Sequence, residues 1–344
     1  MEKIIVGVIG LGMGALHLKG AIEGGAEIKL ICDTNKELLD KVGDEQNIPA
    51  EKRTVNWMDV VNDKDINTVI LATPDQQHRE QVEALLEAGK NVMCEKPLAL
   101  TREDICAMVK AVNAHPECKF MIGQICRFTP SFLKAKELID EGKLGELYFV
   151  ESEYAHDYMH MFEENPTNWR SDPIRHGVVG GGCHAVDLLR WLTGEDPCEV
   201  FAYGTHKLLP EVKYDDATVS LIKFPNNIMG KVFVSTGCKR NYTMRTCIYG
   251  TKGTLIFDNT HPTVEFYEAD ENGHGASVPK TIEVQVNNHN ALQEFASFRD
   301  SLENGTPITM TVEEGAKTVE ACLSIVESSK AGGKVVYPNY NFEN

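Results

Sequence analysis

The sequence has 344 residues, more than one ordinary hydrophobic core organises, and this length predicts two domains. Hydrophobic residues make up 42% and charged residues 25% of the chain, and a net charge of −17 disfavours nucleic acid and anionic membrane as partners. No apolar run is long enough to span a bilayer, no secretory signal is recognisable, and the ten cysteines form no Cys-x-x-Cys pair, so we expect a cytosolic protein with reduced thiols.

The first predicted element is a buried parallel strand at residues 3–9, which runs directly into a glycine turn, GLGMGA, at residues 10–15. A helical pattern follows from Leu16 to Glu23. Strand, glycine turn and helix in this order match the dinucleotide fingerprint. Its first glycine makes the tight turn, its second lets backbone approach a pyrophosphate, and its small third residue lets the helix pack on the strand. The helix N-terminus then offers the phosphates its partial positive charge.

A second predicted strand, at residues 27–32, ends at Asp33. An acidic residue at about this distance from the glycine turn binds the ribose hydroxyls of a dinucleotide, and its charge repels a 2′-phosphate. Thr34 follows and no arginine is close by, so we favour NAD over NADP, although Lys36 keeps NADP open. Asp33 could at the same time cap the helix predicted from residue 36 to 42.

Further strands and helices alternate up to residue 123, which predicts a doubly wound parallel sheet of the Rossmann type. The strand at residues 91–94 stops at Glu95 and Lys96, and Pro97 keeps Lys96 in extended backbone. Ligands bind at the carboxyl ends of such strands, and a lysine there can carry chemistry because its pKa moves readily with its surroundings. A surface lysine in a turn is the alternative.

From Gly123 onwards the alternation stops, and we expect a second domain with a mainly antiparallel open sheet. Its strands are predicted at residues 146–154, 199–205, 218–224, 228–235, 245–250 and 253–257, and its helices at 183–193, 290–303 and 312–330. The predicted domains are therefore residues 1–122, which bind the dinucleotide, and residues 123–344, which bind substrate. A sheet with one helix-free face often pairs with its symmetry mate, so we expect a homodimer or homotetramer through this sheet.

Three glycines at residues 180–182 open the helix that carries His184 and Asp187. The two lie three residues apart in its first turn, where the helix dipole favours a neutral imidazole. A neutral histidine is what a general base needs at the start of an oxidation. The alternative is a histidine that caps the helix or belongs to the core.

The loop at residues 154–160 combines Tyr154, His156, Asp157 and His160, and the two histidines have a spacing that a metal would accept. No strand or helix context fixes these ligands, so we expect no metal and interpret the loop as a contact surface for sugar hydroxyls. Arg127, together with Arg170 and Arg175, could bind a carboxylate or phosphate bidentately.

Three blocks, VGVIGLG at residues 6–12, ATPDQQH at 72–78 and GKNVMCEKPLA at 89–99, closely resemble the Gfo/Idh/MocA family. Its members are two-domain NAD(P)-dependent oxidoreductases that act mostly on sugars and cyclitols. The resemblance implies that Lys96 touches both the reacting hydroxyl and the cofactor, and that His184 and Asp187 lie on the active-site helix. One departure stands out: many members carry an aspartate four residues before the histidine, where this sequence has Gly180.

These observations and the resemblance together give the predicted site. The cofactor-binding residues are Gly10, Leu11, Gly12, Met13, Asp33, Thr34, Thr73, Pro74, His78, Glu95, Lys96, Trp169 and Arg170. The substrate-binding residues are Lys96, Arg127, Tyr154, His156, Asp157 and His184. The catalytic residues are Lys96, His184 and Asp187.

The predicted function is that of an NAD-dependent dehydrogenase that oxidises a secondary hydroxyl of a sugar, glycoside or cyclitol by hydride transfer to nicotinamide. His184 takes the hydroxyl proton, Lys96 stabilises the alkoxide and Asp187 orients the site. Two other hypotheses stay open. One is a redox-assisted glycosidase or lyase that recycles its NAD in place, and the other is a sugar or NAD sensor without catalysis.

Overall fold

The computed structural model describes residues 3–165 and 167–343, and the chain divides into two compact units. Unit 1 comprises Met1–Ile125, Asn290–Ala316 and Asn341–Asn344, and unit 2 comprises Cys126–His289 and Lys317–Tyr340. The division expected from the sequence, at residues 122 and 123, left residues 290–316 with the second domain, whereas their contacts place them in unit 1. Within the described residues, no helix is long and apolar enough to cross a membrane.

The sheet of unit 1 has six parallel strands in the order β3-β2-β1-β4-β5-β6. Their bounds are β1 Ile5–Ile9, β2 Glu27–Cys32, β3 Arg53–Thr54, β4 Thr68–Leu71, β5 Asn91–Glu95 and β6 Phe120–Gly123. This order confirms the predicted Rossmann sheet. The strand order reverses between β1 and β4, and in such sheets the crevice at the carboxyl ends of these two strands is where a dinucleotide binds.

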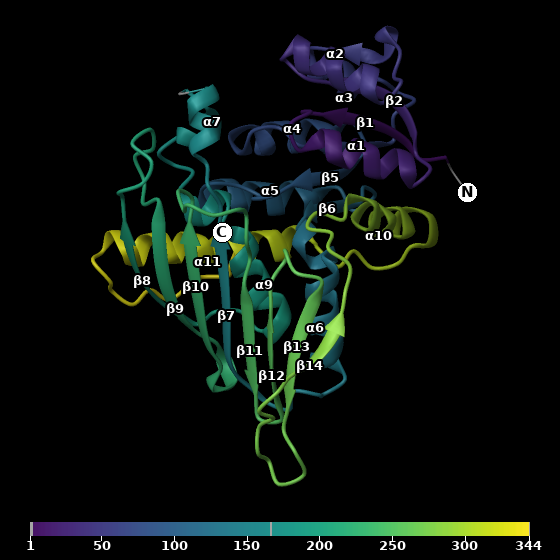
Figure 1. The fold of residues 1–344 in the computed structure, drawn as a ribbon. Helices are drawn as coiled ribbons and strands as arrows, with labels where there is room; N and C mark the ends of the chain where they lie inside the picture. The colour runs from purple at the N-terminus through teal and green to yellow at the C-terminus, as the bar shows by residue number, and fades with distance from the viewer. Residues whose placement is uncertain (1–2, 166, 344) are drawn as a thin grey trace. The chain divides into compact units, whose positions relative to one another are not determined.

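Helices cover this sheet (Figure 1). They are α1 Gly14–Glu23, α2 Lys36–Glu45, α3 Trp57–Asn62, α4 His78–Glu87, α5 Arg102–Ala114 and α10 Ala291–Asn304. Asn35, and not Asp33, caps α2, because its side chain accepts hydrogen bonds from the N–H groups of Glu37 and Leu38. Asp33 is thus free of the capping role that the sequence left open.

Helix α10 packs against α1, although nearly 270 residues separate them in the chain. The approach is close because Gly20 has no side chain: a Cβ there would lie 2.7 Å from the backbone of Ala291. Phe295 and Phe298 are fully buried beside it. The apolar face of α10 therefore completes the core of unit 1 rather than that of unit 2.

The sheet of unit 2 has eight strands in the order β14-β13-β12-β11-β7-β10-β9-β8. Their bounds are β7 Leu147–Ala155, β8 Glu199–Thr205, β9 Ala217–Lys223, β10 Met229–Ser235, β11 Thr246–Gly250, β12 Gly253–Phe257, β13 Thr263–Glu268 and β14 Lys280–Glu283. All neighbours are antiparallel except β7 and β10, which run parallel. The mainly antiparallel sheet is confirmed, while β13, β14 and the parallel pair were not predicted.

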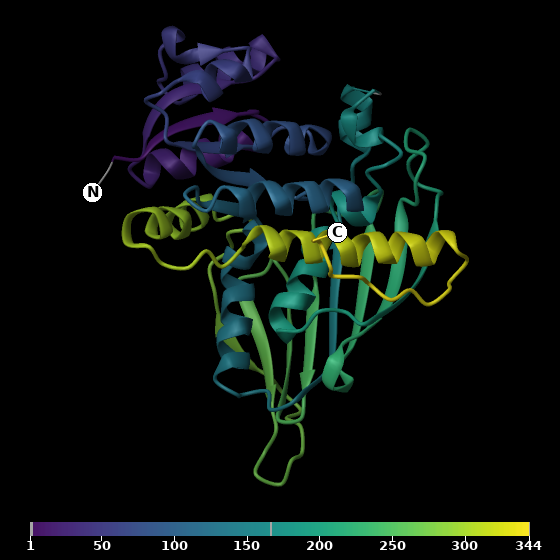
Figure 2. The ribbon, with the colours of Figure 1, turned by 180° about the vertical axis from the view of Figure 1, so that it is seen from behind.

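Helices lie over one face of the sheet of unit 2 (Figure 2). They are α6 Pro130–Asp140, α9 Cys183–Thr193 and the C-terminal part of α11 Val312–Lys330, while the short helices α7 Met159–Glu164 and α8 Gly177–Gly180 belong to the connection between β7 and α9. The strand pattern shows the same asymmetry. In β9 the buried residues Ser220 and Ile222 alternate with the exposed residues Val219 and Leu221. Helix α9 packs on β7 and β10 at the centre of the sheet, which fixes the first turn that carries His184.

Candidate active site

The glycine turn after β1 has the geometry that a dinucleotide requires. Gly10 has a φ of +84°, and a Cβ on it would lie 2.5 Å from the carbonyl oxygen of Ala72. A Cβ on Gly12 would meet nothing within 4 Å, so its exposed backbone is open to approach. The turn thus needs glycine at its first position for the fold and at its second for access by a pyrophosphate.

Asp33, at the carboxyl end of β2, is held against this turn. Its Oδ2 accepts a hydrogen bond of 2.7 Å from the N–H of Leu11, and its Oδ1 accepts one of 2.8 Å from the N–H of Asn35. The carboxylate is half-buried and points to the same strand edge as Gly12. Gly10, Gly12 and Asp33 therefore fit NAD, with the ribose hydroxyls at Asp33 and the pyrophosphate at the N-terminus of α1.

The loop after β4 is tied to the segment after β5 by His78. The imidazole is fully buried, with Nδ1 2.9 Å from the carbonyl oxygen of Pro97 and Nε2 3.1 Å from that of Thr73. The Thr73 hydroxyl donates to Oε1 of Gln81 at 2.6 Å. His78 was predicted among the cofactor residues. This geometry favours an indirect role, in which His78 holds the loop of Thr73 and the segment of Pro97 in place.

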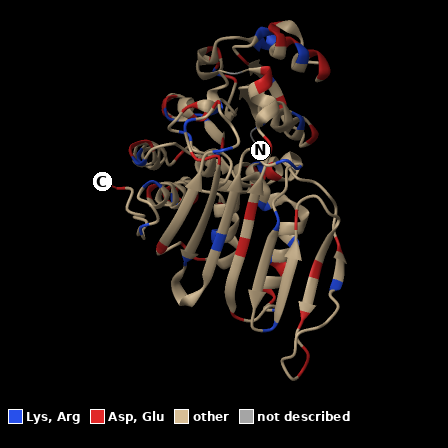
Figure 3. Cartoon of the chain, turned by 60° about the vertical axis from the view of Figure 1, so that its left-hand side comes forward, with Lys and Arg blue, Asp and Glu red and all other residues tan. Residues whose placement is uncertain are grey.

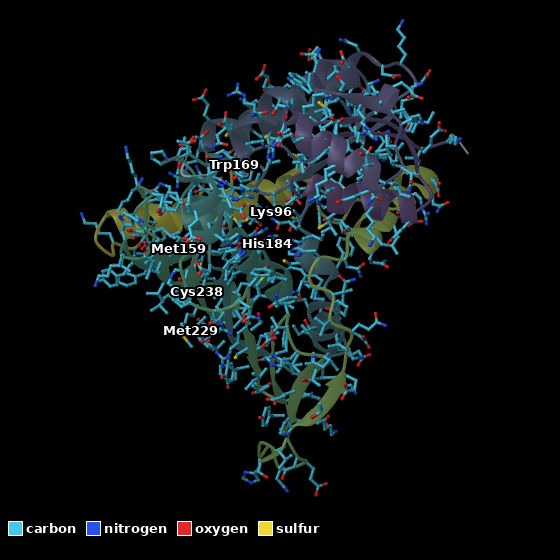
Figure 4. The ribbon with its side chains drawn as sticks, turned by 45° about the horizontal axis from the view of Figure 1, so that its top comes forward. Lys96, Met159, Trp169, His184, Met229 and Cys238 are labelled. Atoms are coloured by element: carbon cyan, nitrogen blue, oxygen red, sulfur yellow. The ribbon has the colours of Figure 1, made fainter. Side chains whose placement is uncertain are left out.

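Lys96 follows β5 directly, is half-buried and precedes a cis Lys96–Pro97 peptide bond (Figure 4). The carboxylate of Glu95 is buried, accepts the N–H of Lys96 at 3.0 Å and lies 2.6 Å from Nε2 of His17. The backbone that carries the Lys96 side chain is therefore fixed by a carboxylate one residue earlier. Sequence reasoning named Glu95 but missed His17, whose only signal was a histidine on the apolar face of α1.

In unit 2, His184 is the second residue of α9 and is buried, with its ring stacked against Tyr154 at a centroid distance of 6.1 Å. The Tyr154 hydroxyl lies 2.9 Å from that of Tyr158 and 3.1 Å from Nδ1 of His156. Burial raises the pKa of Tyr154 well above its ordinary value, so this phenol stays protonated. The structure thus gathers Tyr154, His156 and His184, and it places beside them Tyr158, which the sequence offered, with His156 and Asp157, as a substitute for the aspartate missing at Gly180.

The space beside Gly180, where the resemblance noted above implies an aspartate in many members, is filled by Arg175. A Cβ on Gly180 would lie 2.1 Å from Cζ of Arg175, whose Nη2 donates to the Gly180 carbonyl oxygen at 3.1 Å. The same guanidinium lies 4.8 Å from the centre of the Trp169 ring, and Arg170 lies 4.3 Å from it. Figure 4 labels Trp169 and His184 in this unit.

Asp187 is joined to Arg127, a pairing that the sequence did not suggest because 60 residues separate the two. Nε and Nη2 of Arg127 donate to the two carboxylate oxygens at 2.8 and 2.7 Å, and the Thr318 hydroxyl adds a third bond at 3.0 Å. All three side chains are buried. Arg127 was predicted to bind substrate and Asp187 to take part in catalysis. The geometry of the pair favours a structural role for both, in which they hold α9 in place.

The loop after β7 contains the polar residues whose spacing suggested a metal site. Asp157 accepts the N–H of Met159 at 3.0 Å, and the rings of His156 and His160 are 6.5 Å apart. Among the described residues, no group of three or more His, Cys, Asp or Glu side chains could hold a metal ion.

Comparison with known proteins places the chain among oxidoreductases. Residues 4–124 match the family model described as "Oxidoreductase family, NAD-binding Rossmann fold", and residues 132–256 match the "GFO/IDH/MocA C-terminal domain". The myo-inositol 2-dehydrogenase of Thermotoga maritima is 26% identical over 321 residues, 90% of this chain and 91% of that protein.

Solved structures show the same fold. Levoglucosan dehydrogenase in complex with NADH and levoglucosan superposes with a TM-score of 0.88 at 24% identity, covering 98% of this chain and all of that one. Scyllo-inositol dehydrogenase from Lactobacillus casei, with NAD(H) and scyllo-inositol bound, gives 0.80 at 25% identity, over 98% and 99% of the two chains. With both family models matched across most of its length, the chain belongs to the Gfo/Idh/MocA family of NAD-binding oxidoreductases.

Proposed function

We propose that this protein is an NAD-dependent dehydrogenase that oxidises a secondary hydroxyl of a sugar, glycoside or cyclitol, with Lys96 and His184 as its catalytic pair. Relatives that act on myo-inositol, scyllo-inositol and levoglucosan support the substrate class. The observation that carries the proposal is the place of Lys96, at the carboxyl end of a parallel strand with its backbone N–H held by Glu95.

Each residue has a separate task in this reaction. His184 accepts the hydroxyl proton, and Tyr154 holds the imidazole plane by stacking. The Lys96 ammonium stabilises the developing alkoxide. Asp187 keeps α9 in place through Arg127 and Thr318. NAD, when bound, supplies the hydride acceptor.

The test is turnover of the Lys96→Met variant with NAD and a panel of myo-inositol, scyllo-inositol and levoglucosan, followed as NADH absorbance. We expect kcat to fall at least about 100-fold, because the charge that stabilises the alkoxide is gone, while the Kd for NADH changes less than about threefold. Lys110→Met, an exposed lysine of α5, is the matched control and should keep wild-type turnover. A Lys96→Met enzyme within tenfold of the wild type would contradict the catalytic role. Release of one NADH per substrate oxidised would exclude the NAD-recycling alternative.

We further propose that a second copy of the chain covers the helix-free face of the unit 2 sheet. Tyr203, Leu221 and Met229 on neighbouring strands are each 55% exposed, and apolar side chains gathered on one exposed face are typical of an interaction surface. Figure 3 shows this sheet as mostly uncharged, with acidic and basic segments on its central strands, where Glu151 pairs with Lys231. A homodimer or homotetramer would bury these side chains.

Sedimentation of the Leu221→Glu variant tests this assembly. A charge on the buried face should convert the oligomer to monomer at micromolar concentration. Leu133→Glu, the same substitution at an exposed leucine of α6, which lies on the helix-covered side of the sheet, is the control and should leave the assembly unchanged. An oligomer unchanged by Leu221→Glu would contradict the proposal. The cytosolic location stays a prediction from the sequence.

A further inference from the structure

A histidine and two glutamates meet in the core of unit 1 behind the glycine turn. His17 of α1, Glu95 of β5 and Glu294 of α10 are 1%, 6% and 0% exposed. Nε2 of His17 lies 2.6 Å from Oε1 of Glu95, and Nδ1 lies 3.3 Å from Oε2 of Glu294. We refer to these three residues as the buried triad. Three elements that are remote in sequence thus place charged side chains at one point.

The two carboxylates differ in how well they are satisfied. Glu95 accepts a hydrogen bond from the Lys96 N–H as well as facing His17. Neither carboxylate oxygen of Glu294 has a hydrogen bond of good geometry among the described residues. Its contact with His17 is therefore an ion pair in which the N–H does not point at the oxygen. A fully buried carboxylate held in this way is costly unless a cation stays beside it, and His17 is the group placed to be that cation.

The pKa values agree with this arrangement. Burial alone would lower the pKa of His17, but the neighbouring carboxylates of Glu294 and Glu95 outweigh it and raise the pKa to about 10. Burial raises the pKa of Glu294 above its ordinary value, although His17 opposes this. The charged groups that face His17 come from β5 and α10, and both are carboxylates.

The triad is not needed to hold the sheet together, because β5 is already paired on both sides, with β4 and β6. What it adds is a link between two parts of the cofactor site. His17 lies one turn into the helix whose N-terminus faces the dinucleotide, and Glu95 holds the backbone from which Lys96 projects.

We propose that His17 and Glu294 are positioning residues of the dehydrogenase. The His17 imidazolium, held between Glu294 and Glu95, fixes the carboxylate that accepts the Lys96 N–H, and so fixes the direction in which the Lys96 side chain leaves the strand. Neither residue touches the reacting atoms. The inference rests on the function proposed above, in which Lys96 acts on the substrate hydroxyl.

The test is the Glu294→Gln variant of the full chain, which keeps the side-chain volume and removes one buried charge. We expect kcat for the most active sugar or cyclitol of the panel to fall about 5- to 20-fold, with KM and the Kd for NADH changed less than twofold. A readout apart from activity is hydrogen exchange of peptides covering residues 91–100, in which the Lys96 amide should exchange at least fivefold faster than in the wild type. His17→Gln should give the same two changes and serves as the second variant.

Leu39→Ala is the matched control for stability alone. Leu39 is buried in α2, which packs on β2 and β3, so its truncation lowers the Tm without touching the triad. At a temperature well below every Tm, this variant should keep wild-type kcat and wild-type exchange at residues 91–100. If Glu294→Gln leaves both quantities unchanged, or if Leu39→Ala changes them equally, the positioning role is overturned. The Lys96→Met variant separates the two hypotheses. If Lys96→Met retains turnover, the proposed function fails. If Lys96→Met loses turnover while Glu294→Gln is fully active, only the positioning inference fails.

Discussion

Each of the two units buries a cluster of charged side chains close in sequence to a proposed catalytic residue. The two clusters differ in how their charges are paired. In unit 2, Arg127 and Asp187 form a bidentate pair with parallel hydrogen bonds, and Thr318 satisfies a remaining acceptor site. In unit 1, one imidazole faces two carboxylates, and only Glu95 is well hydrogen-bonded. One cluster pairs a carboxylate with a guanidinium, whereas the other sets two carboxylates against one imidazole, whose proton reduces their negative charge.

The difference teaches what each cluster can be used for. A guanidinium stays charged throughout the working pH range, so the Arg127–Asp187 pair is a permanent brace for α9. The buried triad depends on a group that titrates, so its strength depends on pH and on the integrity of all three side chains. Three predictions follow this contrast, from the largest effect to the smallest.

Asp187→Asn should destabilise the protein most, by about 3 to 5 kcal/mol, because it removes the carboxylate from a buried guanidinium. Thermal and urea unfolding measure the loss. Glu83→Gln, whose partly exposed carboxylate pairs with the partly exposed Arg79 on α4, is the control and should cost clearly less. Replacing both partners, as Arg127→Met with Asp187→Leu, should recover much of the loss, and a double variant less stable than Asp187→Asn would argue against a matched pair.

The second prediction concerns alkaline pH. Because the pKa of His17 is about 10 in the folded state and about 6.5 unfolded, its contribution to stability is complete below pH 6.5 and is lost as the pH rises to 10. The raised pKa of Glu294 acts in the same direction, since that group too favours the folded state when protonated. Unfolding measured from pH 6.5 to 10 should show the wild type losing at least about 2 kcal/mol more than Glu294→Gln. Equal losses would show that the triad carries no linked proton.

The smallest effect is expected at Thr318, whose hydroxyl accepts from Nη1 of Arg190 at 2.8 Å and donates to Asp187 at 3.0 Å. Thr318→Val keeps the shape and removes both bonds, and should cost about 1 to 2 kcal/mol. Thr318→Ser keeps the hydroxyl and should retain most of the stability. If Thr318→Val were as damaging as Asp187→Asn, the bidentate pair would not be the main element of the brace.

Sequence reasoning predicted the fold correctly where a feature is local. The glycine turn after β1, Asp33 after β2 and Lys96 after β5 each have their context within about 30 residues, so the strand pattern and the turn residues predict their places, while their roles stay predictions. It failed where partners are remote: Arg127 meets Asp187 across 60 residues and His17 meets Glu95 across 78. A buried histidine on a helix has the same local pattern as a core residue. Only the packing of α10 on α1 brings Glu294 to it.

That packing has a consequence for how the protein is made. As the chain leaves the ribosome, β5 and Glu95 emerge early, but Glu294 follows about 200 residues later, which at ordinary translation speeds is a delay of roughly 10 to 40 seconds. Until then, the nascent nucleotide-binding half lacks the helix that closes its core. An N-terminal fragment ending at residue 125 is therefore expected to fold poorly on its own. The segment around Lys96 reaches its final conformation only after the last fifth of the polypeptide has been synthesised.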